Sequence, residues 1–559
     1  MKRKGHEKQK NSPLKQYNSY LNKNNNTIVI ATVVIYLLLS FLTFNLRISE
    51  GGDDSAYIIR ALQLLEEGRF PRFQGPLYPA VLAGFVAILG LSMVALKLSS
   101  WVFMSLSLIL LWKTYSKRIS TLSLTATIFI LVVNHHFLYF ASQTYSEAFF
   151  LALQGGFLLY LFPTIEWQKQ HRIKIIQTAI LALFLVSLYL TRTVAFVATP
   201  AVILYFAIQK QKRALLFTTL FVIAFIFAYF LLLNFFTEGG ASSGDQLTTL
   251  LQKHPYDKSQ GMETLPGFFL RFWENSKIYL SKHFFILTGF KPAMSLTKPA
   301  FPAIVLYLFF FWGLIRFYKK NHQFIFFTGI YIALSVGLTF FALQPLWDQV
   351  RLIIPFFPLI LIFFLETILD LAKSKERRWL QRLSLFLISA AIVLSAAQTI
   401  RQTDFSSVFR NIKGEKLYGY TPDWQNYLKM SEYVAKGLPD EAFVACRKPN
   451  MARLHSGGKQ FYGIYTIDSE SPDTLLMKLY QRDVTHIMVA SLRKNPRIKS
   501  GQVINTIHRY MSAISKKYPN AFILKKQIGS DEKAWLFEID YNNFLKNNPN
   551  LNEAKPQQK

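Results

Sequence analysis

Twelve apolar stretches run through the chain, and they constrain its fold more than any other feature of the sequence. Each has about the length of a transmembrane helix, which needs ~20 largely apolar residues to cross the hydrocarbon core of a bilayer. They lie at residues 27–46, 76–91, 92–112, 121–140, 147–163, 174–191, 193–208, 214–235, 300–316, 323–342, 351–371 and 382–400. The chain of 559 residues is therefore predicted to be a polytopic α-helical membrane protein.

The basic residues indicate how these stretches are oriented. A net charge of +31 would also suit a nucleic-acid-binding protein, but the lysines and arginines lie mainly in short loops beside apolar stretches and in the tail. This arrangement is typical of membrane proteins, whose cytoplasmic loops are basic. The clusters that mark cytoplasmic loops are 113–118, 169–174, 210–213, 316–320 and 373–378.

These cytoplasmic loops are mutually consistent only if one stretch does not cross the membrane. The stretch 76–91 is short and begins with two prolines, Pro76 and Pro79, so we expect it to form an outer-leaflet or re-entrant helix. About eleven transmembrane helices remain, with the N-terminus in the cytoplasm and the C-terminus outside. A nucleic-acid partner is not expected.

Residues 401–545 have a different pattern, in which runs of strand length alternate with helix-like stretches. The expected strands are 442–445, 460–465, 486–490, 521–524 and 534–539, and the expected helices are 423–437, 472–481 and 502–517. This alternation is typical of a soluble α/β domain, which the topology places on the extracytoplasmic side. It contains the single cysteine, Cys446, so no intramolecular disulfide is expected.

The chain is thus predicted to consist of four regions. These are a disordered basic cytoplasmic tail (1–27), a membrane domain (28–400) with a first outer loop (47–75) and a large outer loop (236–299), an extracytoplasmic α/β domain (401–545) and a disordered tail (546–559).

In this topology the unusual polar residues of the membrane domain gather on the outer side. Asp53 and Asp54 lie in the first outer loop, and Glu147 lies at the outer start of an apolar stretch. Arg192 lies in a tight outer turn, and Asp348 and Arg351 lie in another, so that carboxylate and guanidinium groups share one face. The interiors of the stretches carry almost no charge, which disfavours an ion-coupled transporter, because such proteins need ionisable groups near the midplane.

Each of these residues also has a structural interpretation. Asp53 and Asp54 precede an amphipathic helix, and an acid there can cap the helix and interact with its dipole. Glu147 can be an ordinary residue at the start of a helix, and Arg351 can pair with Asp348. Arg192 has no sequence neighbour of opposite charge, and a functional role is therefore favoured for it.

The order of these motifs resembles the GT-C glycosyltransferase superfamily, in particular protein O-mannosyltransferases and lipid A aminoarabinose transferases. The segment Asp53-Asp54-Ser55-Ala56-Tyr57 resembles the acidic pair that opens the first outer loop in that group. The segments SQTYSEAFF, LYLTRTVAF and QVRLIIPFFPLI resemble, in this order, its second acidic motif, its Thr-Arg turn and its Arg-x-x-x-Pro-x-x-Pro span. The second acid is Asp rather than Glu, and Gln74-Gly75-Pro76 stands in place of a Lys-Pro-Pro element, so the acceptor of the aminoarabinose branch is not carried over.

The resemblance implies an inverting glycosyltransferase that moves a sugar from a polyprenyl-phosphate donor to an acceptor outside the membrane, with a glycan, a lipid or a protein as acceptor. A carboxylate must then accept the acceptor's proton, and Asp53 is the first candidate, with Asp54 and Glu147 as further catalytic candidates. The candidates for binding the donor phosphate are Arg192, Arg351 and Arg60, and those for positioning the substrates are Tyr57 and Asp348.

Cofactor use and location follow less directly. Asp54 and Glu147 either orient the acceptor or complete a site for a divalent metal, Mg²⁺ or Mn²⁺, which hard carboxylate ligands favour. The plasma (inner) membrane of a bacterium is the expected location, with lipid-linked sugar and the bilayer as partners. The alternative function is a non-enzymatic flippase of lipid-linked sugars or a protein of polysaccharide export; it predicts that Asp53 is replaceable.

Overall fold

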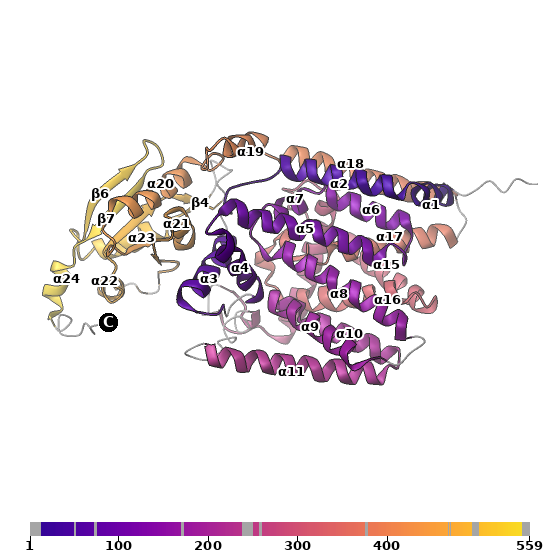
Figure 1. Ribbon diagram of the computed structural model, residues 1–559. Helices are drawn as coiled ribbons and strands as arrows, with labels where there is room; N and C mark the ends of the chain where they lie inside the picture. The colour runs from indigo at the N-terminus through magenta and orange to yellow at the C-terminus, as the bar shows by residue number, and fades with distance from the viewer. Residues whose placement is uncertain are drawn as a thin grey trace, which may run out of the picture. The chain divides into compact units, whose positions relative to one another are not determined.

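The computed structural model describes residues 13–49, 52–71, 75–168, 173–236, 250–255, 260–374, 378–467, 469, 471–494 and 502–549. The chain forms two compact units. The first, the membrane unit, comprises residues 1–44 and 60–405 and consists of helices (Figure 1). The second unit comprises residues 45–59 and 406–559 and contains the β-sheet. Each unit is described by itself.

Helices form all of the regular structure described in the membrane unit. Its elements are α1 (Pro13–Lys23), α2 (Asn25–Leu42), α4 (Leu77–Leu89), α5 (Met93–Tyr115), α6 (Thr121–Val132), α7 (His135–Ala141), α8 (Ser146–Gln168), α9 (Ile175–Thr191), η1 (Thr193–Val197), α10 (Ala198–Ile208), α11 (Lys212–Phe236), α13 (Leu265–Ser276), η3 (Lys277–His283), α14 (Phe284–Leu287), α15 (Ala300–Lys319), α16 (Gln323–Ala342), η4 (Pro345–Trp347), η5 (Val350–Leu352), α17 (Phe357–Ser374) and α18 (Arg378–Gln402). Helix α3 (Asp53–Glu67) begins in the second unit and ends in the membrane unit.

Among the described residues, seven helices are long and apolar enough to cross a membrane, and an eighth span is formed if α6 and α7, bent by 65°, count as one. The seven are α2, α5, α8, α11, α15, α16 and α18. This confirms an integral, polytopic α-helical membrane protein, but the count is lower than the eleven expected. The difference lies in α9 and in η1 with α10, which are short, and in α17, which carries Glu366, Asp370 and Lys373. Helix α4, in the stretch expected not to cross, is also a short apolar helix.

Two segments to which the sequence assigned no helix contain helices. Residues 13–23, in the predicted disordered tail, form α1, because Leu14 packs into an apolar cluster with side chains of α6, α17 and α18. Asn18 and Asn22 of α1 also accept hydrogen bonds from Leu122 N and Thr121 Oγ1 at the start of α6. In the predicted large outer loop, residues 265–287 form α13, η3 and α14; residues 237–249 and 256–259 of that loop lie outside the described residues.

Helices α8 and α16 lie in the interior of the membrane unit, with two thirds of their apolar windows buried, whereas only 11% of the window of α11 is buried. Buried polar side chains join these interior helices. Gln154 of α8 donates to the hydroxyl of Tyr331 of α16 at 3.0 Å, and the hydroxyls of Tyr115 and Thr328 lie 2.7 Å apart. Because each hydrogen bond satisfies a group shielded from water, these pairs fix how α16 faces α8 and α5.

The second unit contains a five-stranded sheet in the order β2-β1-β3-β7-β6. Its strands are β1 (Val444–Cys446), β2 (Phe461–Gly463), β3 (His486–Ala490), β6 (Phe522–Ile528) and β7 (Ala534–Ile539), and a separate pair is formed by β4 (Leu492–Arg493) and β5 (Val503–Ile504). Strands β2, β1 and β3 are parallel, whereas β7 is antiparallel to β3 and to β6. All five strands expected from the sequence are found, with bounds that differ by a few residues.

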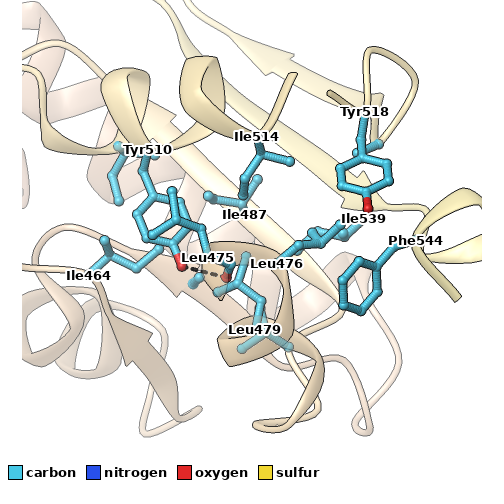
Figure 2. Packing of buried hydrophobic residues seen from close by; sticks show 14 of the residues in the cluster. Ile464, Leu475, Leu476, Leu479, Ile487, Tyr510, Ile514, Tyr518, Ile539 and Phe544 are labelled. Atoms are coloured by element: carbon cyan, nitrogen blue, oxygen red, sulfur yellow. Dashed lines mark hydrogen bonds between the residues drawn. The ribbon is translucent and has the colours of Figure 1, made fainter. Parts of the chain in front are cut away.

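Helices complete the second unit: α19 (Phe405–Ile412), α20 (Pro422–Gly437), α21 (Pro449–His455), α22 (Pro472–Tyr480), α23 (Thr506–Ser515) and α24 (Asn542–Asn547). Figure 2 shows one apolar layer of this unit, in which leucines of α22 and residues of α23 pack against Ile487 and Ile539 of the sheet. The hydroxyl of Tyr510 is buried in this layer and donates to Leu475 O at 2.7 Å.

Residues 45–59 belong to the second unit, although the sequence assigned the whole of 47–75 to the membrane domain. Long-range contacts explain the difference. The Arg47 guanidinium donates to Gly419 O and lies over the ring of Tyr420, whose hydroxyl donates to Ile48 O at 2.6 Å. Contacts between residues so far apart in the sequence leave no local signal.

Candidate functional site

A buried carboxylate lies at the start of α8. Glu147 occupies the first turn of this helix, where the helix dipole favours negative charge, and it is fully buried. Its Oε1 atom lies 2.7 Å from Nη1 of Arg192 and 3.1 Å from Nε of Arg351. These three residues, which we call the Glu147 cluster, come from three separate parts of the membrane unit.

The local backbone positions both arginines. Arg192 ends α9 in an extended conformation, directly before η1, and its Nη1 also contacts Ser146 Oγ at 3.3 Å. Gly75, with φ +81°, lies so close to Thr191 O that a Cβ atom would overlap this oxygen, so this approach requires glycine. Arg351 lies in η5, and its guanidinium carbon is 4.6 Å from the centre of the Tyr145 ring.

The Glu147 cluster carries more positive than negative charge. Two guanidinium groups share a single carboxylate oxygen, and their side chains remain 11% and 17% exposed. The second oxygen, Oε2, is buried and has no hydrogen-bond partner among the described residues. The oxygens of a buried carboxylate normally have hydrogen-bond partners. The two guanidinium groups of this cluster are suited to bind an anion, and the Oε2 atom of Glu147 is suited to accept a hydrogen bond from a hydroxyl group.

A second group of charges surrounds Asp348. Its carboxylate accepts hydrogen bonds from Lys282 Nζ and His283 Nε2, both at 2.7 Å. Asp348 thus pairs with Lys282 and His283 rather than serving as the structural partner of Arg351. Both partners lie in η3, a short π-helix, a rare conformation that is frequent at functional sites.

These contacts change how the groups titrate. Burial acts to raise the pKa of Asp348, but the hydrogen bonds from Lys282 and His283 outweigh it and hold that pKa below its ordinary value. Burial lowers the pKa of His283, and its hydrogen bond to Asp348 opposes this only in part. At neutral pH the Asp348 group therefore contains one anion, one ammonium and a neutral imidazole.

The paired acids at the start of α3 differ sharply in their surroundings. Asp54 is fully buried and accepts three hydrogen bonds: from Ser49 N at 2.7 Å, from Ser49 Oγ at 2.8 Å and from Ser55 N at 2.9 Å. Asp53, the first residue of α3, is half-buried. Of the other candidates on this helix, Tyr57 is buried and Arg60 is half-buried.

The structure therefore brings Glu147, Arg192 and Arg351 together and places Asp348 in its own group, while Asp53, Asp54 and Tyr57 belong to the second unit. Sequence reasoning missed Lys282 and His283. Their only signal is a charged pair inside the apolar run 278–287, within a region expected to be a loop. Tyr145 and Ser146 were also missed, although they directly precede Glu147.

Solved structures share this architecture. ArnT from Cupriavidus metallidurans bound to undecaprenyl phosphate matches with a TM-score of 0.52 and 9% identity, over 91% of this chain and 97% of that one. The Archaeoglobus fulgidus oligosaccharyltransferase in complex with Zn and sulfate matches with a TM-score of 0.50 and 12% identity, over 83% and 68%. Both are GT-C glycosyltransferases. The chain has the GT-C fold.

This result confirms, at the level of fold, the resemblance drawn from the motifs. ArnT without a ligand matches equally well, with a TM-score of 0.51 over 92% of this chain and 98% of that one. No protein-family model matches the sequence, and no curated protein matches it either. The GT-C fold is thus recognisable in three dimensions at an identity of about one residue in ten.

One of these neighbours, the Archaeoglobus fulgidus oligosaccharyltransferase, was determined with Zn. Within the described ranges, no three His, Cys, Asp or Glu side chains lie close enough together to hold a metal ion jointly. Asp54 already accepts two hydrogen bonds on Oδ1 and one on Oδ2. No step of the chemistry below uses a metal ion.

Proposed function

We propose that this protein is an inverting glycosyltransferase, which moves a sugar from a polyprenyl-phosphate donor to an acceptor on the outer side of the membrane. The observation that carries the proposal is the Glu147 cluster, in which one buried carboxylate holds two guanidinium groups in a protein with the GT-C fold. ArnT, which shares this fold, was crystallised with undecaprenyl phosphate, and this supports a lipid phosphate as the carrier of the sugar.

The chemistry needs positive charge where the donor breaks. An acceptor hydroxyl or amine attacks the anomeric carbon, the bond from that carbon to the phosphate oxygen breaks, and the lipid phosphate leaves with the bonding electrons. Negative charge grows on the phosphate as it leaves, and preorganised guanidinium groups stabilise it. Arg192 and Arg351 are suited to this task because the buried carboxylate of Glu147 holds both of their guanidinium groups.

The acceptor must lose its proton as it attacks, and Asp53 is the base that we favour. A general base has to reach the acceptor, and Asp53 is half-buried at the start of α3. Asp54 is less suited, because it is fully buried and its carboxylate already accepts three hydrogen bonds. Asp54 instead anchors the start of α3 and thereby positions Asp53.

The same proposal assigns locations. The N-terminus lies in the cytoplasm and the second unit outside, as the basic clusters of the sequence indicate. The plasma membrane of a bacterium fits this arrangement, and a glycan, a lipid or a protein serves as acceptor. Tyr57, Arg60 and Asp348 have positioning roles in this scheme.

The test is sugar release from a panel of radiolabelled polyprenyl-phosphate sugars by the purified protein. Wild type should release sugar from at least one donor, and Asp53→Asn should reduce release about 10²–10⁴-fold, the usual contribution of a general base. Glu66→Gln changes an exposed carboxylate on the same helix and should leave the rate unchanged. Equal rates for Asp53→Asn and wild type would remove Asp53 as the base. Binding of the lipid without any turnover would favour the flippase alternative.

A further inference from the structure

The carboxyl ends of three parallel strands meet at one edge of the second unit. The strand order β2-β1-β3 means that the chain leaves β1 for a neighbour on one side and later returns on the other side. In open α/β sheets, ligands bind outside the carboxyl ends of strands at such a reversal of strand order. The residues that follow these strands are Arg447 and Lys448 after β1, Tyr465 after β2 and Ser491 after β3.

Arg447 lies at this edge with no charged partner among the described residues. Its guanidinium carbon lies 5.4 Å from the centre of the Tyr465 ring, which is 52% exposed. Its Nε atom is buried and has no hydrogen-bond partner among the described residues. A buried donor left without an acceptor is costly, so a binding partner for Arg447 is the simplest reason to keep it there.

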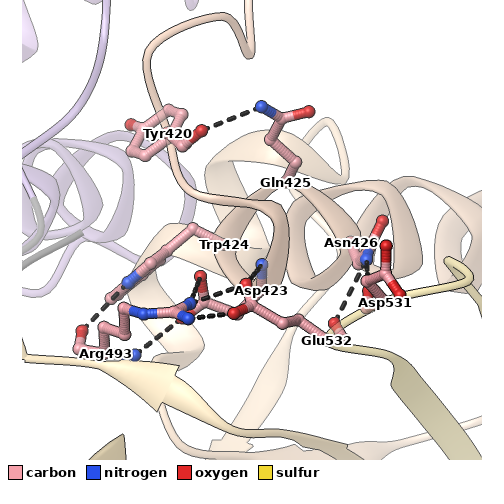
Figure 3. A network of polar contacts seen from close by, with 8 residues as sticks. All are labelled: Tyr420, Asp423, Trp424, Gln425, Asn426, Arg493, Asp531 and Glu532. Atoms are coloured by element: carbon pink, nitrogen blue, oxygen red, sulfur yellow. Dashed lines mark hydrogen bonds and ion pairs between the residues drawn. The ribbon is translucent and has the colours of Figure 1, made fainter. Parts of the chain in front are cut away.

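Nearby residues hold this arrangement in place. A Cβ atom added to Gly463 would lie 2.7 Å from the Tyr465 ring and 2.9 Å from Pro449 Cγ, so the Tyr465 ring packs closely over the end of β2. Arg493, after β3, shows the contrast: it pairs with Asp423 and Glu532 and is saturated (Figure 3). Arg493 thus pairs with two carboxylates, whereas Arg447 pairs with none in the part of the chain that the structure describes.

Lys448 connects this edge to the start of α3. Its Nζ lies 4.0 Å from the position that a Cβ atom on Gly52 would occupy, and Gly52 directly precedes Asp53 within the second unit. The Lys448 backbone N–H donates to the hydroxyl of Tyr427 at 3.1 Å, which fixes the turn after β1. Lys448 therefore lies beside the segment that carries Asp53, and Arg447, over the Tyr465 ring, directly precedes it in the chain.

We propose that Arg447, Lys448 and Tyr465 form an anion-binding subsite that holds a phosphate or carboxylate group of the acceptor beside Asp53. This inference deepens the proposed function and rests on it, because only a glycosyltransferase makes the bound molecule an acceptor. A guanidinium group binds phosphate and carboxylate through paired hydrogen bonds, and an ammonium group adds a second positive charge. The exposed ring of Tyr465 offers an apolar face to a sugar that bears the anion. The acceptor is accordingly an acidic molecule rather than a neutral one.

The experiment is calorimetric titration of the full-length protein with glucose 6-phosphate and with glucose, in a buffer free of phosphate. Wild type should bind glucose 6-phosphate and not glucose, and Arg447→Met should weaken binding at least tenfold. Arg410→Met is the matched control: Arg410 also lies over a tyrosine, Tyr418 at 4.3 Å, but it pairs with Glu415 and is half exposed. Equal affinity of wild type and Arg447→Met would overturn the subsite.

Thermal unfolding separates binding from a structural role. Arg447→Met removes a guanidinium group without an ion pair among the described residues, so its melting temperature should equal or exceed that of wild type. A melting temperature several degrees below that of wild type would instead make Arg447 a structural residue and contradict the inference.

Two further arms identify the source of the anion and keep the two proposals distinct. Titration with undecaprenyl phosphate should give the same affinity for wild type and Arg447→Met; a loss there would assign the subsite to the donor and overturn its role for the acceptor. Titration of Asp53→Asn with glucose 6-phosphate should give wild-type affinity, because binding needs no turnover. Sugar release with no binding of glucose 6-phosphate would reject the subsite alone, and binding without release from any donor would reject the proposed function alone.

Discussion

In the membrane unit one carboxylate is shared by two guanidinium groups, whereas in the second unit one guanidinium group is shared by two carboxylates. Glu147 contacts Arg192 and Arg351 through a single oxygen. Arg493 contacts Asp423 at 2.8 Å and also pairs with Glu532. Both clusters are largely buried and both join distant parts of the chain, so burial and sequence distance do not distinguish them. Their charge balance does.

The charged groups of the Arg493 cluster are occupied by one another and by the backbone, and we call such a cluster closed. Besides the ion pairs, the Arg493 backbone N–H donates to Asp423 Oδ2 at 2.7 Å, and Trp424 Nε1 donates to Arg493 O at 3.0 Å. Figure 3 shows these contacts joining α20 to β4 and to the turn that carries Glu532. The Glu147 cluster is open, because it has positive charge in excess and one buried oxygen without a partner among the described residues. A closed cluster stabilises a fold, and an open one is available to a ligand.

The sharpest test of this difference removes one guanidinium group from the open cluster. Arg351→Met should lower sugar release about 10²–10³-fold, because a donor aimed at the developing phosphate charge is lost. Arg118→Met is the matched control, since Arg118 pairs with Glu166 at 2.8 Å near the other end of α8. Rates of release are measured at saturating donor. Equal losses in both variants would mean that the Glu147 cluster has no special role.

The complementary change is made in the closed cluster. Arg493→Met leaves Asp423, which is fully buried, without its guanidinium partner, and should destabilise the second unit by about 3 kcal/mol. The folded variant should release sugar at the wild-type rate. Arg410→Met, which removes an exposed pair with Glu415, should cost about 0.5 kcal/mol or less. Hydrogen exchange of residues 406–549 measures the effect; a normal exchange pattern with slow sugar release would reverse the two assignments.

The sequence predicted the elements of the fold better than its long-range contacts. The apolar stretches, the strands near 444–446 and 486–490 and the short helix near 77–89 follow from local composition and period, and the structure contains all of them. The helix over 13–23 was missed because its stability comes from packing of Leu14 against α6, α17 and α18. The membership of residues 45–59 in the second unit was missed because it depends on contacts with Gly419 and Tyr420.

The candidate site shows the same limit. Glu147, Arg192 and Arg351 were selected because charges are unusual beside apolar stretches, a property that each residue has on its own. That two arginines would share one oxygen of Glu147 could not be predicted, since it depends on where three turns meet. Lys282 and His283 were missed because only the π-helix and the position of Asp348 give them a role. A pattern of residue types thus identifies candidates, and their partners come from the fold.

The Asp348 group lies between the two clusters in charge balance, and pH can shift it. At neutral pH one carboxylate faces one ammonium group and a neutral imidazole; protonation of His283 would give two cations on one carboxylate, the ratio of the Glu147 cluster. Because burial holds the pKa of His283 below its ordinary value, the unfolded chain takes up this proton first as pH falls. His283 therefore destabilises the folded state progressively below the unfolded pKa of about 6.5.

The effect expected from the titration of His283 is the smallest of the three, and it is measured as the change of thermal stability with pH. Between pH 7.5 and 5, wild type should lose more thermal stability than His283→Gln, by a few degrees at pH 5, because the variant has no imidazole to protonate. Asp348→Asn should steepen the loss, since the carboxylate that favours the imidazolium form is gone and the pKa of His283 falls further. Parallel melting curves for all three proteins would show that His283 titrates alike in the folded and unfolded chains. The Asp348 group would then reach the charge ratio of the Glu147 cluster at the ordinary pKa of histidine, about 6.5.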